Sequence, residues 1–172
     1  MNIGTSLLLE QHAAALPEAA GAWRARQFDY NAAAARIVSY AYCPGDAANR
    51  SRSSIDPRTY FWARDFLRTL TASDECIVTT WLQSYEEELN VYAKETGTYL
   101  MPFNTNNVDP TVATNALFGL TTLLVRGHTA WLEQPGARST YLTTARFLAW
   151  TVGNQPNISR PDLETLYYPS TM

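Results

Sequence analysis

Two Asp-Pro pairs, Asp56-Pro57 and Asp109-Pro110, constrain the fold of this chain more than any other feature. An Asp at the N-cap accepts a hydrogen bond from a free backbone N–H, and a Pro at the first helical position has no donor to leave unpaired. Helices are therefore predicted to begin at Pro57 and Pro110. Both pairs precede apolar residues at helical spacing. These residues are Tyr60, Ala63, Leu67 and Leu70 after the first pair, and Val112, Ala113, Ala116, Leu117, Leu120, Leu123 and Leu124 after the second.

Each of these helices has a predicted antiparallel partner nearby in the sequence. Ser73 is a suitable N-cap for a helix that runs to Gly97, with apolar positions at Val78, Trp81, Leu82, Tyr85, Leu89 and Tyr92. The helix after Pro110 is predicted to stop at Gly127, and its partner to run from about Ser139 to Gly153. Because the first link is very short and the second is a loop through Pro135-Gly136, the helices of each pair are expected to pack as hairpins.

The remaining segments complete an all-α prediction. An Ala-rich helix is expected from Glu18 to about Tyr42, a weaker one from Thr5 to Leu16, and a short one after Ser159 and Pro161. Ala47 to Ser54 and Gly97 to Asp109 are predicted to be loops. No run alternates as a strand would. The expectation is a single helical domain over residues 1–172, built from antiparallel helical hairpins.

Composition excludes several classes of function. The net charge is −3, and no basic cluster is present of the kind that binds phosphates. No apolar run approaches the roughly 18 residues of a membrane helix, so a soluble chain is expected. His12 and His128 have no neighbouring ligands at metal spacing, and no glycine-rich phosphate loop occurs. Neither a metal nor a cofactor is therefore expected, and no nucleic-acid partner. The oligomeric state stays open.

Two features are compatible with secretion without requiring it. Cys43 and Cys76 permit one disulfide but do not demand it, and Asn49-Arg50-Ser51 and Asn157-Ile158-Ser159 are glycosylation sequons. Leu7 to Leu9 lack a positive region before them, so they make a poor signal peptide. The localisation is left open.

The segment from Arg58 to Asp65 combines aromatic rings with an ion pair. Tyr and Trp rings suit the C–H face of a sugar, and Arg and Asp can grip hydroxyl groups. Tyr60, Trp62, Arg64 and Asp65 fill the fixed positions of Tyr-x-Trp-x-Arg-Asp, so the segment resembles the signature of glucoamylase-like glycoside hydrolases. The resemblance implies an (α/α)6 toroid of helical hairpins, and implies that Arg64 and Asp65 bind the sugar ring beside the scissile bond.

The chain departs from that family in length. Too little sequence follows Asp65 to hold the family's catalytic acid and base at their usual separations, so no catalytic residue is assigned. The expected fold is therefore a partial toroid-like array, either a shortened relative or a fragment of a larger toroid. The alternative is that Trp62 and Phe66 are core residues and that Arg64 and Asp65 form a solvated pair.

Two further stretches are candidates for the same chemistry. Asn106, Asn107 and Asp109 could bind sugar hydroxyls, since an amide offers both donors and an acceptor. The alternative is that the Asn residues form a turn and Asp109 is only an N-cap. Glu86 to Glu88 could supply a second carboxylate at the roughly 5 to 10 Å that glycoside hydrolysis needs, or could form an exposed acidic face.

Two functions follow from these observations. The first is a carbohydrate-active protein, a glycoside hydrolase or a fragment of one. The second is a non-catalytic helical domain that binds a partner or ligand. Whether the chain is an enzyme is left open. The carbohydrate-active function requires that Trp62, Arg64 and Asp65 line one concave site that contains a second carboxylate. The non-catalytic function does not.

Overall fold

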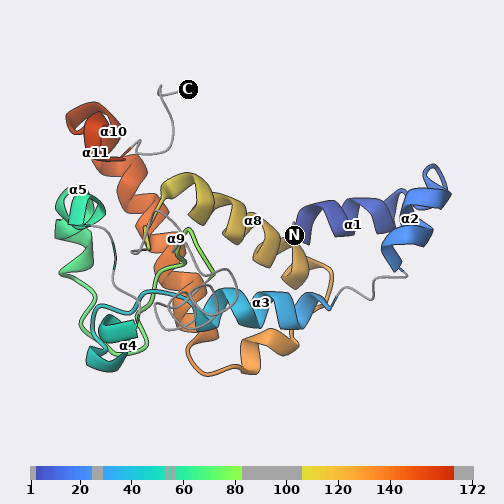
Figure 1. Ribbon diagram of the computed structural model, residues 1–172, viewed down its shortest axis with the longest axis horizontal. Helices are drawn as coiled ribbons and strands as arrows, with labels where there is room; N and C mark the ends of the chain where they lie inside the picture. Colours follow the sequence, from blue (N-terminus) through green and yellow to red (C-terminus); the bar gives the residue numbers. More distant parts are fainter. Residues whose placement is uncertain (1–2, 25–28, 53–54, 56, 83–105, 165–172) are drawn as a thin grey trace, which may run out of the picture.

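The computed structural model describes residues 3–24, 29–52, 55, 57–82 and 106–164. The described residues confirm the all-α prediction, and their only β pairings are isolated bridges. The α-helices are α1 (Ile3–Gln11), α2 (Pro17–Arg24), α3 (Tyr30–Ser39), α4 (Ala47–Arg52), α5 (Pro57–Leu67), α8 (Pro110–Val125), α9 (Ala137–Asn154), α10 (Pro156–Ser159) and α11 (Pro161–Glu164), with a 3-10 helix, η2, at Ala130–Glu133. In Figure 1, α1 and α2 project from one end, and α4, α5, α10 and α11 lie at the other.

The boundaries of α8 follow the sequence prediction. The Asp109 carboxylate accepts hydrogen bonds from the backbone N–H groups of Thr111 and Val112 at 2.8 and 3.0 Å. Gly127 follows the helix with a φ of 80°. Through η2 the chain turns back into α9, which runs in the opposite general direction (Figure 1), so the predicted hairpin of α8 and α9 is confirmed. The end of α9 differs in one detail, because the left-handed residue is Gln155 and not Gly153.

Two predictions in the first third of the chain are wrong. A single helix from Glu18 to Tyr42 is contradicted because Asp29 is extended and caps a new helix, accepting from the Ala32 N–H at 2.9 Å. The predicted loop from Ala47 to Ser54 contains α4, whose first turn is fixed by a 2.9 Å hydrogen bond from the Ala48 N–H to Asp46. In both places one aspartate starts a helix, and the capping interaction outweighs the surrounding composition.

The helix predicted from Ser73 to Gly97 is also wrong over residues 73–82, which are irregular or extended, while residues 83–97 lie outside the described residues. Ile77 forms an antiparallel bridge with Tyr42, and the Thr80 N–H donates to the Asn107 carbonyl at 2.8 Å. Ile77 to Thr80 are all β-branched and therefore favour extended backbone. Trp81, predicted on the buried face of that helix, is only half-buried.

Two apolar clusters form the core. The first joins α5 to α8, α9 and the extended segments, through Tyr42, Trp62, Ala63, Phe66, Leu67, Leu70, Ile77, Val108, Ala113 and Phe147. The second joins α1, α3, α8, η2 and α9, through Ile3, Tyr30, Ala34, Val38, Leu120, Leu123, Trp131 and Ala137. The first cluster therefore packs α5, which precedes residues 73–82 in the sequence, against α8 and α9, which follow them. The toroid-like arrangement of hairpins stays a prediction.

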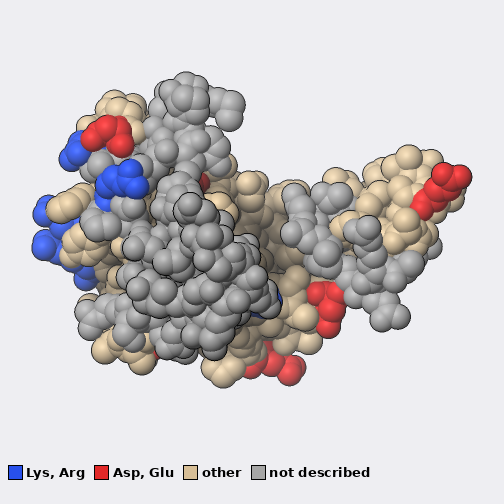
Figure 2. Space-filling model, in the orientation of Figure 1, with Lys and Arg blue, Asp and Glu red and all other residues tan. Residues whose placement is uncertain are grey.

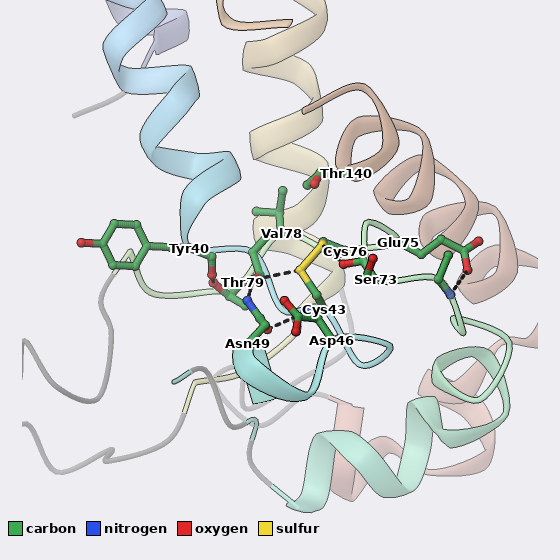
Figure 3. The surroundings of a disulfide bond; sticks show 12 residues. Tyr40, Cys43, Asp46, Asn49, Ser73, Glu75, Cys76, Val78, Thr79 and Thr140 are labelled. Atoms are coloured by element: carbon green, nitrogen blue, oxygen red, sulfur yellow. Dashed lines mark hydrogen bonds between the residues drawn. A yellow bond between two sulfur atoms is a disulfide. The ribbon is translucent and has the colours of Figure 1, made fainter. Parts of the chain in front are cut away.

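A disulfide between Cys43 and Cys76 joins the turn after α3 to the extended segment (Figure 3). The approach of the two turns is close: a Cβ at Gly45 would collide with the carbonyl oxygens of Thr71 and Ala72, so only glycine fits there. The pairing that the two cysteines permit is therefore present, and it is supported on both sides by tightly packed backbone.

The turn before Cys76 is tied to α9 by Glu75. Its carboxylate accepts from Arg146 at 2.9 Å and from the N–H groups of Thr71 and Ala72 at 3.1 and 3.2 Å. The Arg146 guanidinium is the largest cause that holds the pKa of Glu75 below its ordinary value, and the Ala72 N–H is the next. The charged form is therefore favoured in the folded state.

Glu75→Gln is expected to destabilise the protein by at most about 1 kcal/mol at neutral pH, because the pair is partly exposed. A lowered pKa contributes stability above the unfolded value of about 4.3, and this stability is lost as the pH falls through the folded pKa. The difference between the two proteins should therefore shrink toward about pH 3. Urea unfolding at both pH values measures it, and a difference that grows in acid would contradict this role.

Candidate functional site

The predicted aromatic and ion-pair cluster does not form one concave surface. Trp62 is 7% exposed and packs against the rings of Phe147 and Trp150, at centroid distances of 5.7 and 6.2 Å. Arg64 and Asp65 form a 3.5 Å ion pair whose side chains are 47% and 78% exposed. The positions match the alternative of a core Trp and a solvated pair, and Tyr60 is exposed. A sugar-binding role for Tyr60, Arg64 and Asp65 stays a prediction.

The predicted amide and carboxylate side chains near residue 106 are buried, and those of Asn106 and Asp109 bond the backbone. The Asn106 amide accepts from the Trp81 N–H at 3.0 Å and donates to the Trp81 carbonyl at 2.9 Å. Asn107 is buried, and Asp109 is the N-cap of α8. A bridge between Ile55 and Asn106 does bring this segment beside the approach to α5, but these side chains do not join Arg64 and Asp65 at the surface. Glu86 to Glu88 lie outside the described residues.

A hollow of about 370 Å³ lies elsewhere, between α1, α3, α8 and the extended segment. Ligand pockets begin at about 300 Å³, so this hollow has room for a small molecule. We call it the α8 hollow; it is lined by Ile3, Ile37, Val78, Thr79, Thr80, Leu82, Val112, Asn115, Ala116 and Gly119. None of these lining residues carries a group that ionises near neutral pH, and none belongs to the predicted site.

The shape of the α8 hollow follows from small side chains on α8. Gly119 faces Ile3 of α1, and a Cβ at this position would lie 3.5 Å from the Cβ of Ile3, in ordinary van der Waals contact. Ala116, nearly one turn earlier, leaves the adjoining space unfilled. Sequence reasoning assigned Val112 and Ala116 to a core stripe and missed the hollow. The spacing of Val112, Ala116 and Gly119 on one face was the available signal.

The polar side chains of the α8 hollow differ in whether they form hydrogen bonds within the protein. The Thr80 hydroxyl donates to the Asn107 carbonyl at 3.0 Å. The Thr79 hydroxyl lies 3.0 Å from the carbonyl oxygens of both Tyr40 and Trp81, and it donates to one of them. The Asn115 amide makes no hydrogen bond to any described residue, and it is exposed at the rim. It is therefore the group best placed to meet an incoming polar atom.

Basic side chains gather at one end of the molecule. In Figure 2, most of the visible basic side chains lie at the end of the molecule that carries α5, α10 and α11. Within the described ranges, no helix has the length and apolar content needed to cross a bilayer. No family model, curated protein or solved structure matches the chain.

Proposed function

We propose that this chain is a non-catalytic binding domain that takes a small, uncharged, mostly apolar molecule into the α8 hollow. The observation that carries the proposal is a space of about 370 Å³ whose described walls are mostly aliphatic, with one amide, that of Asn115, which makes no hydrogen bond to a described residue. Burial of apolar ligand surface there contributes roughly 25 cal/mol per Å², and the amide adds orientation. Acid–base catalysis would need a positioned group that ionises, which the described lining residues do not offer.

The chemistry of the walls narrows the ligand class. Ile3, Ile37, Val78 and Val112 present branched aliphatic surface. The hydroxyl groups of Thr79 and Thr80 are already engaged with backbone carbonyls, so they present mainly their methyl groups. A charged ligand would lose hydration without a partner charge, which is costly. An alcohol, ketone or ester with an apolar body meets these conditions, because Asn115 can both donate and accept.

Benzyl alcohol is a suitable probe, and Ala116→Phe is the variant that tests the site. A Phe at this position would occupy the space that the probe needs, so affinity should fall at least about tenfold, which corresponds to roughly 1.4 kcal/mol. Saturable shifts of the Ile3, Ile37, Val78 and Val112 methyl resonances in NMR titrations report the binding of the probe to the wild-type protein.

Ala149→Phe is the matched control, since Ala149 is exposed on α9 and lies outside the hollow. It should bind the probe as the wild type does. Equal affinity of the Ala116 and Ala149 variants, with folding verified by circular dichroism, would remove the hollow from consideration. Shifts scattered over the protein, without saturation, would do the same.

A carbohydrate ligand is our second proposal, in keeping with the resemblance to glucoamylase-like enzymes. The exposed face of α5 supports it, because the rings of Tyr60 and Phe61 lie edge to face at 6.4 Å beside Arg64 and Asp65. On this proposal the α8–α9 hairpin belongs to a toroid-like array. The titration repeated with maltotriose separates the two, because a sugar on α5 would shift the Tyr60 and Phe61 ring resonances and leave the hollow methyl groups unchanged.

A further inference from the structure

The two sequons occupy different environments. Asn49, in α4, is 8% exposed, and both its side-chain oxygen and its side-chain nitrogen form hydrogen bonds. The Asn49 side-chain oxygen, Oδ1, accepts from the Cys43 N–H at 2.8 Å, and Nδ2 donates to the Ala41 backbone carbonyl at 3.1 Å. Figure 3 shows this side chain directed at the turn that carries the disulfide. Asn49 therefore holds the backbone on both sides of Tyr42.

Asn157 has none of these ties. It lies in α10 at the edge of the molecule (Figure 1), half-buried, beside Ile158, which is 70% exposed. Its amide makes no hydrogen bond to any described residue. The Ser159 hydroxyl, which completes the sequon, is exposed, and its contact with the described residues is a long one of 3.4 Å to the Pro156 carbonyl. A bulky group on Asn157 would therefore replace no hydrogen bond to a described residue.

We infer that the folded, secreted chain carries an N-glycan on Asn157 and none on Asn49. The Cys43–Cys76 disulfide fits a compartment that oxidises thiols, and in eukaryotes that compartment also carries out N-glycosylation. The transfer joins Asn157 Nδ2 to C1 of the first sugar of a polyprenyl-diphosphate-linked oligosaccharide. The C1–O bond breaks, polyprenyl diphosphate leaves with the electron pair, and Nδ2 loses one proton.

The oligosaccharide is transferred to a chain that has not yet folded. Folding therefore decides afterwards whether a chain glycosylated at Asn157 or at Asn49 can reach the native state. A glycan on Asn157 is compatible with α10 and its surroundings. A glycan on Asn49 would have to fit at a position that is 8% exposed, where the side chain bonds the backbone of Ala41 and Cys43, so the turn around Cys43 could not close around it. Molecules modified at Asn49 should therefore fail to form the Cys43–Cys76 disulfide and should be retained in the cell.

The test is to express the full chain behind a cleavable leader in a eukaryotic secretory cell and to analyse the secreted protein. Removal of glycans by peptide N-glycosidase in H₂¹⁸O marks each modified Asn as ¹⁸O-labelled Asp for mass spectrometry. We expect the mark on Asn157 in most secreted molecules and on Asn49 in none, with the Cys43–Cys76 peptide oxidised. Secreted protein that lacks a glycan on Asn157 overturns the inference.

Two sequon variants provide the matched comparison. Ser159→Ala should abolish the mobility shift on deglycosylation, whereas Ser51→Ala, which leaves the Asn49 side chain in place, should preserve it. A secreted, disulfide-bonded protein that carries the ¹⁸O label at Asn49 would overturn the inference that this residue has no glycan in the folded chain. The assignment is independent of the α8 hollow, since no residue of either sequon lines it.

Discussion

Removal of the Cys43–Cys76 disulfide is expected to lower the free energy of unfolding by about 4 kcal/mol. The cysteines are 33 residues apart, and the bond restricts the unfolded chain by closing that segment into a loop. Both residues are buried in the folded protein, in a small cluster with Ala41. The Cys43→Ala/Cys76→Ala double variant and the wild type should therefore differ mainly in the midpoint of urea unfolding followed by circular dichroism.

Reductant provides an internal control for this measurement. Tris(2-carboxyethyl)phosphine should bring the midpoint of the wild type close to that of the double variant, and it should leave the double variant unchanged. A difference below about 1 kcal/mol between wild type and double variant would show that the bond adds little to contacts already present around Gly45 and Asn49. The same result would follow if the unfolded chain were already compact in this region.

Phe147→Ala is expected to cost roughly 3 to 5 kcal/mol, the usual range for emptying a large buried aromatic site. Phe147 is 0% exposed, and its ring lies 5.7 Å from that of Trp62 and 5.5 Å from that of Phe66. These contacts hold α5 against α9. The loss should appear in equilibrium urea unfolding as a lower midpoint.

Phe118→Ala is the matched control, because it removes the same side chain from a position on α8 that is 65% exposed. Its expected effect is within about 0.5 kcal/mol. If the Phe147 variant lost less than about 1 kcal/mol, the first apolar cluster would not be the packed core that holds α5. Equal losses of unfolding free energy in the Phe147 and Phe118 variants would also show that the first apolar cluster is not the packed core that holds α5.

The features that sequence predicted well depend on neighbouring residues alone. Asp109 caps the helix that begins one residue later, and Gly127 supplies a left-handed conformation at its end. Both interactions span a few residues, so residue type and spacing are sufficient to identify them. The cap at Asp29 is of the same kind, but it lies in an Ala-rich stretch whose composition also favours one continuous helix, so residue type alone does not decide between the two.

The segment from Ser73 to Leu82 could not be assigned from local pattern. Its apolar spacing fits a helix, whereas its hydrogen bonds are made with Tyr42, Asn107 and, through the Val78 N–H, Thr144 of α9. Those partners are distant in sequence. The β-branched run from Ile77 to Thr80 favoured extended backbone, but a preference of this kind is decided by what the segment packs against.

Long-range packing also explains why the sequence did not indicate which side chains of α5 are exposed or where the α8 hollow lies. Trp62 and Arg64 are separated by a single residue, so they cannot face the same way on a helix. Which of them is buried is decided by the docking of α5 on α9, as the Trp62–Phe147 contact shows. The α8 hollow depends on α1, α3 and α8 together, and its existence follows from their packing and not from any motif.

The position of the disulfide has a consequence for the order of events during synthesis. Cys43 and Cys76 are synthesised well before α9, whose first residue, Ala137, follows Cys76 by 61 positions and whose Phe147 and Trp150 rings cover Trp62 and Phe66. The covalent ring, which contains α4 and α5, can therefore close while the helix that covers Trp62 and Phe66 does not yet exist. A growing chain oxidised at this stage would expose an aromatic surface until α9 is complete, and a chaperone that binds such surfaces would meet it in that interval.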